Sequence, residues 1–171
     1  MIAMVIAFFS LHSPAFESQG IIPQEYGCSG KGMSPELVWE NPPEGTEYFT
    51  LIVQDETNDL VLWKLRQIPS ELRRIPRGGA LPKGVLEEIH YKPFCPPFGE
   101  KHHYVFALYA MKGEDKSLEG EIVGKAEMKA FFQQEPHKTA PNPPFKNPNR
   151  KENPDALESA SYPLQEEEEE G

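Results

Sequence analysis

Hydrophobic and polar positions along the chain form short runs that are separated by proline- and glycine-rich turns. From Leu62 to Ile68 apolar and polar side chains broadly alternate, which is typical of a strand with one buried face. No regular succession of strands and helices is visible, so an antiparallel β-sandwich is expected rather than a parallel sheet. The expected fold class is therefore mainly β, with strands at residues 37–39, 48–53, 61–68 and 103–111.

The chain opens with an apolar run from Met1 to Phe9 that continues to Leu11 and stops at Ser13-Pro14. The run lacks a preceding basic segment, is far shorter than a membrane span and shows no clear small-residue cleavage site. We therefore favour a buried first strand over a signal peptide. This interpretation predicts a cytoplasmic protein without membrane insertion.

The pattern of short apolar runs between turns changes after Gly113. Residues 118–134 contain good helix formers with modest amphipathicity, which predicts one helix. Closely spaced prolines then exclude a helix and indicate an extended strap or a linker. The last residues include five consecutive glutamates, which repel one another. The expected organisation is a β domain at 1–135, a Pro-rich extended segment at 136–164 and an acidic tail at 165–171.

Charge is concentrated at the C-terminal end of the chain. The formal net charge is -10 over 171 residues, and residues 151–171 hold eight acidic residues against one lysine. About -3 remains for the rest of the chain by subtraction, which is ordinary for a domain of this size. A protein with this charge is not expected to bind nucleic acid.

A stiff turn precedes the strand expected at 103–111. Pro93, Pro96 and Pro97 restrict the backbone and remove hydrogen-bond donors, and Gly99 allows the chain to reverse. The turn thereby places His102 and Tyr104 at the beginning of the strand that follows it. This arrangement predicts a small polar pocket at one end of the sheet.

Several separated motifs resemble the phosphatidylethanolamine-binding protein family, most closely its bacterial and archaeal branch, whose vertebrate relatives include the Raf kinase inhibitor protein. The resemblance covers roughly residues 5–112, with the motifs in the family's order. It implies two antiparallel sheets with one or two small helices toward the C-terminus. It also implies a pocket for phosphate-like and other small anionic groups. The motifs are Ser13-Pro14-Ala15-Phe16, Ile22-Pro23, Tyr26 to Gly30, Ser34 to Trp39, Pro43 to Thr46, Asp55, Cys95 to Gly99, His102 to Phe106 and Leu108 to Ala110.

The resemblance places a ligand site where the family has its pocket. A carboxylate beside His102 would raise the pKa of the imidazole and make it a donor for anions. The chain departs from the family pattern at Leu62, where the family has a histidine, and at His103, where it has an arginine. Pro93-Phe94 also replaces the family's Gly-Pro. The implied ligand-binding residues are Asp55, His102 and Tyr104, with Pro93, Phe94, Cys95 and Pro96 as the wall.

Three alternatives to a working anion pocket stay open. The polar residues at the strand ends could simply satisfy one another, because buried polar groups need partners in any case. His102 and Asp55 could serve a weak hydrolase. The chain could also be a degenerate relative with a closed pocket that acts as a scaffold. We expect no enzyme, because none of the serines in the N-terminal loops has a nucleophile motif around it.

Partners and cofactors follow from the same interpretation. The expected ligand is a small anionic or phosphate-bearing molecule, and a protease or a kinase is a further candidate partner that the resemblance implies. No cofactor is expected, and no metal site is supported by the residue spacing. Cys28 and Cys95 are expected to be two reduced thiols rather than a disulfide, unless the source is a hyperthermophile.

Overall fold

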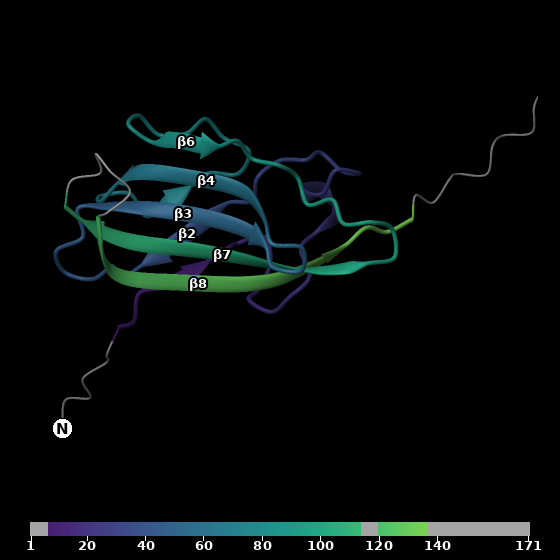
Figure 1. Cartoon of the computed structure of the whole chain (residues 1–171), viewed down its shortest axis with the longest axis horizontal. Helices are drawn as coiled ribbons and strands as arrows, with labels where there is room; N and C mark the ends of the chain where they lie inside the picture. Colours follow the sequence, from purple (N-terminus) through teal and green to yellow (C-terminus); the bar gives the residue numbers. More distant parts are fainter. Residues whose placement is uncertain (1–6, 114–119, 137–171) are drawn as a thin grey trace, which may run out of the picture. The chain divides into compact units, whose positions relative to one another are not determined.

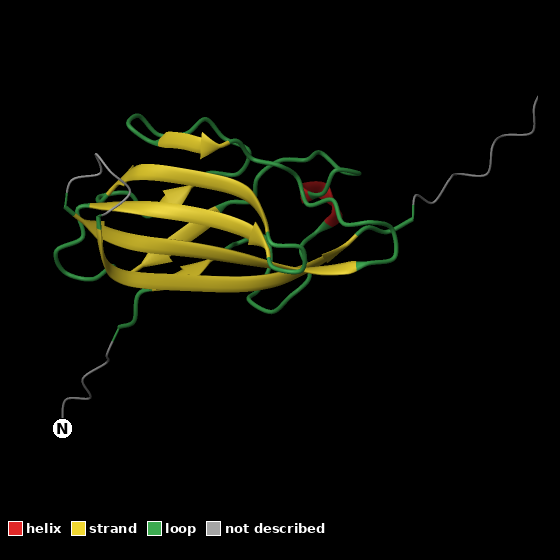
Figure 2. Ribbon diagram, in the orientation of Figure 1, coloured by secondary structure: helices red, strands yellow, loops and turns green. Residues whose placement is uncertain are grey.

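The computed structural model describes residues 7–113 and 120–136, and these form two antiparallel sheets (Figures 1 and 2). The larger sheet has five strands in the order β6-β4-β3-β7-β8, and the smaller has three in the order β1-β2-β5. The larger sheet consists of β6 (Leu86–Ile89), β4 (Leu60–Pro69), β3 (Tyr48–Asp55), β7 (Lys101–Lys112) and β8 (Glu121–Gln133). The smaller sheet consists of β1 (Ser10–His12), β2 (Leu37–Glu40) and β5 (Arg74–Ile75). The sandwich predicted from the sequence is confirmed.

The core lies between the two sheets. In β3 the residues Phe49, Leu51 and Val53 are buried and alternate with partly exposed ones, so this strand has one buried face. Trp39 of β2 packs edge-on against Phe49, with ring centroids 5.5 Å apart, and this contact joins the two sheets. The same alternation continues on β7, where the even-numbered side chains from His102 to Ala110 are buried.

The helix expected over residues 118–134 is wrong. Residues 121–133 form β8, which pairs with β7 along its whole length. The buried side chains there are Ala126, Met128, Ala130 and Phe132, at every second position. Alanine and methionine are good helix formers, but a period of two and a long pairing partner decide the conformation. Within the described residues the one helical element is the 3-10 turn η1 (Gln24–Tyr26).

Within the described residues, the buried first strand expected from the apolar N-terminal run is found only at the end of that run, where Leu11 is buried in β1. Residues 7–9 form no strand, and the side chain of Phe8 is 75% exposed. The strand begins only at Ser10, where it pairs with Glu40 of β2. Across residues 7–113 and 120–136, no helix is long and apolar enough to span a membrane.

Two further differences concern short elements. β5 pairs with β2 in a segment for which the sequence predicts no strand, and β6 at the edge of the larger sheet likewise carries no strong sequence pattern. The Pro-rich segment and the acidic tail lie outside the described residues from position 137 onward. Their boundaries therefore remain predictions.

Candidate functional site

The predicted pocket residues meet at the ends of two neighbouring strands. Asp55 is the last residue of β3 and pairs directly with Tyr104 of β7, so their side chains share the inner face of the sheet. His102 precedes Tyr104 by two positions and points to the same face. The His102 Nδ1 and Asp55 Oδ2 atoms are 2.6 Å apart, and both residues are buried. The structure thus brings together the three residues that the sequence and the resemblance predict.

A second carboxylate, which the sequence interpretation missed, contacts the other nitrogen of the imidazole. Glu100 Oε2 lies 3.1 Å from His102 Nε2, and the Glu100 side chain is 60% exposed. Burial acts to lower the pKa of His102, but hydrogen bonds to Asp55 and Glu100 outweigh it and raise the pKa. The charged imidazolium form of His102 is thus favoured by one buried and one exposed carboxylate. We call Asp55, Glu100, His102 and Tyr104 the His102 site.

Tyr104 occupies the deepest position of the His102 site. Its hydroxyl is buried and makes no hydrogen bond of normal geometry within the described residues. Burial, followed by the nearby Asp55 carboxylate, raises the pKa of Tyr104, so the phenol stays neutral. The neutral hydroxyl therefore lies close to the Asp55 carboxylate of the ion pair.

Phe94 closes the site from the side of the turn. Its ring is fully buried and packs edge-on against Tyr104, with centroids 4.7 Å apart. It also lies against Phe106 and Phe132, at centroid distances of 6.0 and 5.9 Å. A large ring stands where the family signature has a proline, and Asp55, His102 and Tyr104 are at most 4% exposed.

The other predicted wall residues hold the turn in place. Pro96 is buried, and its carbonyl accepts a 2.6 Å hydrogen bond from the Gln134 amide, which also binds Ser29 Oγ. Pro93 contacts the turn at Gly32, where an added Cβ would lie 3.0 Å from the proline ring. Gln134 was not predicted, because nothing in its local sequence distinguishes a buried amide from an exposed one.

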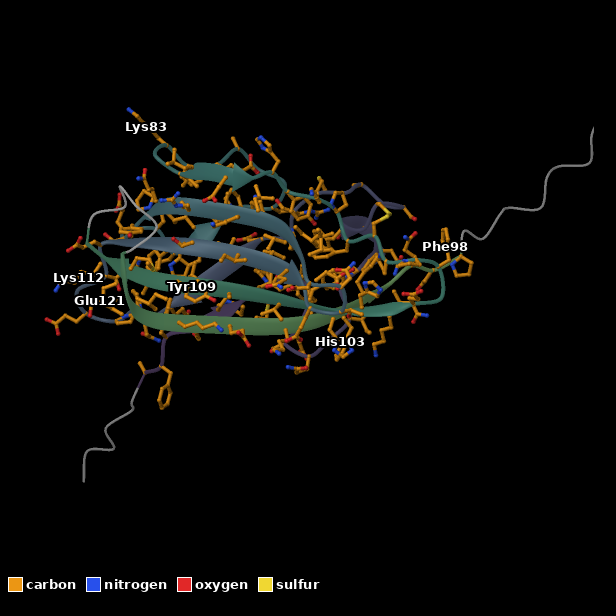
Figure 3. The ribbon with its side chains drawn as sticks, viewed as in Figure 1. Lys83, Phe98, His103, Tyr109, Lys112 and Glu121 are labelled. Carbon is orange, nitrogen blue, oxygen red and sulfur yellow. A yellow bond between two sulfur atoms is a disulfide. The ribbon has the colours of Figure 1, made fainter. Side chains whose placement is uncertain are left out.

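The prediction of two reduced cysteines is wrong, because Cys28 and Cys95 form a disulfide. A parallel bridge between Gly27 and Phe94 brings the two loops together, and the cysteine Cα atoms lie 5.4 Å apart. Both cysteines are exposed. Figure 3 shows the disulfide as a yellow bond at the end of the molecule where Phe98 is labelled.

Removal of the disulfide is expected to destabilise the domain. The bond closes a loop between positions 67 residues apart, so the Cys28→Ser/Cys95→Ser variant should lose about 2 to 4 kcal/mol of unfolding free energy. Urea denaturation of the oxidised protein, of the dithiothreitol-reduced protein and of this variant measures the loss. The reduced protein and the variant should agree. Equal stability of all three would contradict a stabilising role.

His103 and His90 are both exposed. His103 lies on the outer face of β7, where it is labelled in Figure 3, and it cannot share a ligand with His102. In residues 7–113 and 120–136 no group of three or more histidine, cysteine or acidic side chains could hold a metal ion. Leu62 is buried, so the position that is a histidine in the family is apolar here.

Comparison with known proteins agrees with this fold and these motifs. A UPF0098 protein of Aquifex aeolicus is 31% identical over 125 residues, covering 66% of this chain and 73% of the relative. The UPF0098 protein YbcL of Escherichia coli is 33% identical over 120 residues, covering 58% and 66%. Among solved structures, the phosphatidylethanolamine-binding protein homolog CT736 of Chlamydia trachomatis has a TM-score of 0.65 at 26% identity, covering 74% of this chain and 98% of that one.

The E. coli YbcL structure, described as a member of the mammalian PEBP family, superposes with a TM-score of 0.66 at 22% identity and supports the fold. The sequence model of the phosphatidylethanolamine-binding protein family matches residues 12–142, which is most of the chain. This match includes both loops of the disulfide and every residue of the His102 site. The chain therefore belongs to the phosphatidylethanolamine-binding protein family.

Proposed function

We propose that this chain is a binding protein that takes a small anionic group, a phosphate or a carboxylate, at His102 Nε2. The observation that carries the proposal is the Glu100 contact: a carboxylate already lies 3.1 Å from that nitrogen, on a side chain that is 60% exposed. An anion of similar size can replace it without changing the charge around the imidazolium. Glu100 then acts as an internal competitor for the ligand.

The same geometry favours binding over hydrolysis. A general base needs a free, neutral nitrogen within reach of a proton. Both nitrogens of His102 contact carboxylates, and the pKa of the imidazole is raised. An imidazole whose two nitrogens both contact carboxylates is arranged to donate to an anion and offers no free nitrogen as a base, so we propose a protein without enzymatic activity.

A protein partner is a second candidate, because the turn that closes the His102 site also presents an exposed apolar side chain. Phe98 is 63% exposed between the disulfide and Glu100, and Figure 3 labels it at the tip of the turn. A turn tied by a disulfide and by Gln134 loses little conformational entropy on binding. The resemblance implies a protease or a kinase as the partner.

A cytoplasmic location stays a prediction. A persistent exposed disulfide is typical of oxidising compartments and, inside cells, of hyperthermophiles. The proposed cytoplasmic location and the disulfide are therefore compatible in a hyperthermophile.

The replacement Glu100→Gln tests the anion site. Removing the competing carboxylate should strengthen phosphate binding about tenfold, the scale of one charge-assisted hydrogen bond. The effect is measured by titration with inorganic phosphate, in which binding is monitored by isothermal titration calorimetry and by the NMR chemical shifts of His102. Glu56→Gln is the matched control, because Glu56 is exposed at the same end of the sheet and pairs with Lys129 instead.

Two outcomes would contradict the proposal. Equal changes in the Glu100 and Glu56 variants would show that only the overall charge matters. A lack of saturable binding at millimolar phosphate in both the wild type and Glu100→Gln would show that Phe94 keeps the site closed. The scaffold alternative would then be favoured.

A further inference from the structure

A cavity lies outside the His102 site and has its own chemistry. It measures about 510 Å³ and is bounded by the loops at 32–34 and 78–81 on one side and by β4 and β6 on the other. Its lining includes Trp63, Tyr91, Glu87, Ser34, Met33 and Leu81. We call this cavity the Glu87 groove.

Glu87 gives the groove a fixed negative charge. One carboxylate oxygen, Oε1, accepts hydrogen bonds from Trp63 Nε1 at 3.0 Å and from the Tyr91 backbone N–H at 3.3 Å. The other, Oε2, lies 2.7 Å from Nδ1 of His90, whose side chain is 87% exposed. Two carboxylate oxygens offer about four acceptor positions, so Oε2 keeps room for one more donor.

The hydrogen bonds to Glu87 hold its carboxylate ionised. Burial acts to raise the pKa of Glu87, but the bonds from His90, Trp63 and the Tyr91 backbone outweigh it and lower the pKa. The acidic strand neighbour Glu88 is different, because it pairs with Lys64 and Arg66 outside the lining of the groove. Glu87 therefore presents its charge to the groove.

Aromatic rings and an unused hydroxyl complete the lining. The rings of Trp63 and Tyr91 meet edge-on, with centroids 5.4 Å apart. Ser34 is 8% exposed, and its hydroxyl has no hydrogen-bond partner among the described residues. Aromatic faces and a carboxylate together attract cations, and a hydroxyl can accept a further hydrogen bond from an ammonium group.

We propose that the Glu87 groove binds a small organic cation, an ammonium group on an apolar stem, with Glu87 as its charge partner and Trp63 and Tyr91 as the aromatic wall. Met33 and Leu81 would contact the stem. The ammonium could belong to a free amine or to a lysine side chain of a protein. This site shares no residue with the His102 site, so either proposal can fail without the other.

The chain has two tryptophans, so a binding test can use Trp63 as the reporter and Trp39 as the internal control. The indole N–H of Trp63 donates to Glu87, whereas Trp39 lies in the core and its indole N–H has no partner in the described residues. Titration of the full chain with n-butylammonium should move the Trp63 indole signal in a saturable way and leave that of Trp39 in place. The neutral analogue n-butanol should bind at least about tenfold more weakly.

The replacement Glu87→Gln should weaken n-butylammonium binding about tenfold or more, while Glu88→Gln, the same change on the next residue, should leave it within twofold. A lysine-containing peptide that binds more tightly than n-butylammonium would assign the ammonium to a protein side chain, and equal binding would assign a free amine. Equal binding of butanol, equal loss in both variants or no saturable shift at millimolar n-butylammonium would overturn the proposal.

Discussion

Replacing Phe94 with alanine is expected to remove about 3 to 5 kcal/mol of unfolding free energy, the usual range for a fully buried phenylalanine. Its ring is 0% exposed, and it packs against Tyr91, Tyr104, Phe106 and Phe132. Deleting it leaves a cavity beside the buried Tyr104 hydroxyl, and edge-on contacts of this kind add about 0.5 to 1.5 kcal/mol each. Urea denaturation measures the loss.

Phe98→Ala is the matched control, because it makes the same change on the same turn at a side chain that is 63% exposed. Its effect should stay within about 0.5 kcal/mol. A loss below about 1 kcal/mol for Phe94→Ala would mean that the turn collapses into the vacated space. In that case Phe94 would not be the residue that covers the His102 site from solvent.

The sequence predicts the fold of this chain where the hydrophobic pattern is strong and fails where propensity competes with it. The strands at 48–53 and 61–68 could be predicted because their apolar positions are frequent and their ends carry turn formers. The helix expected at 118–134 failed because helix-forming residues fill β8. The period of two at Ala126, Met128 and Ala130 was the better guide.

The candidate site, like the fold, could be predicted only in part from the sequence. Asp55 and His102 are 47 positions apart, and family motifs indicated their proximity. Glu100 could have been considered, because a carboxylate two positions from an imidazole can reach it in a turn. The Cys28–Cys95 bond could not be predicted from spacing, since it depends on the pairing of two irregular loops.

The replacement Asp55→Asn is expected to cost about 3 to 5 kcal/mol of unfolding free energy under mildly acidic conditions, because it removes one partner of a buried ion pair. Asparagine keeps the shape and can still accept the hydrogen bond from the Thr57 backbone N–H. What it removes is the negative charge 2.6 Å from His102 Nδ1. The control is Asp59→Asn, at an exposed position whose positive φ of 57° suits asparagine.

The pH dependence separates this charge effect from a packing defect. In the wild type the pKa of His102 is raised above its ordinary value of 6.5, so its stabilisation is complete below that pH and is lost as the pH rises through the raised value. Without Asp55, burial acts against the imidazolium and only Glu100 supports it, so this contribution shrinks. The stability gap between wild type and Asp55→Asn should therefore be widest below pH 6.5 and narrow toward alkaline pH. Urea denaturation across this range measures it, and a gap that is constant or widens with pH would show that the His102–Asp55 contact is not an ion pair.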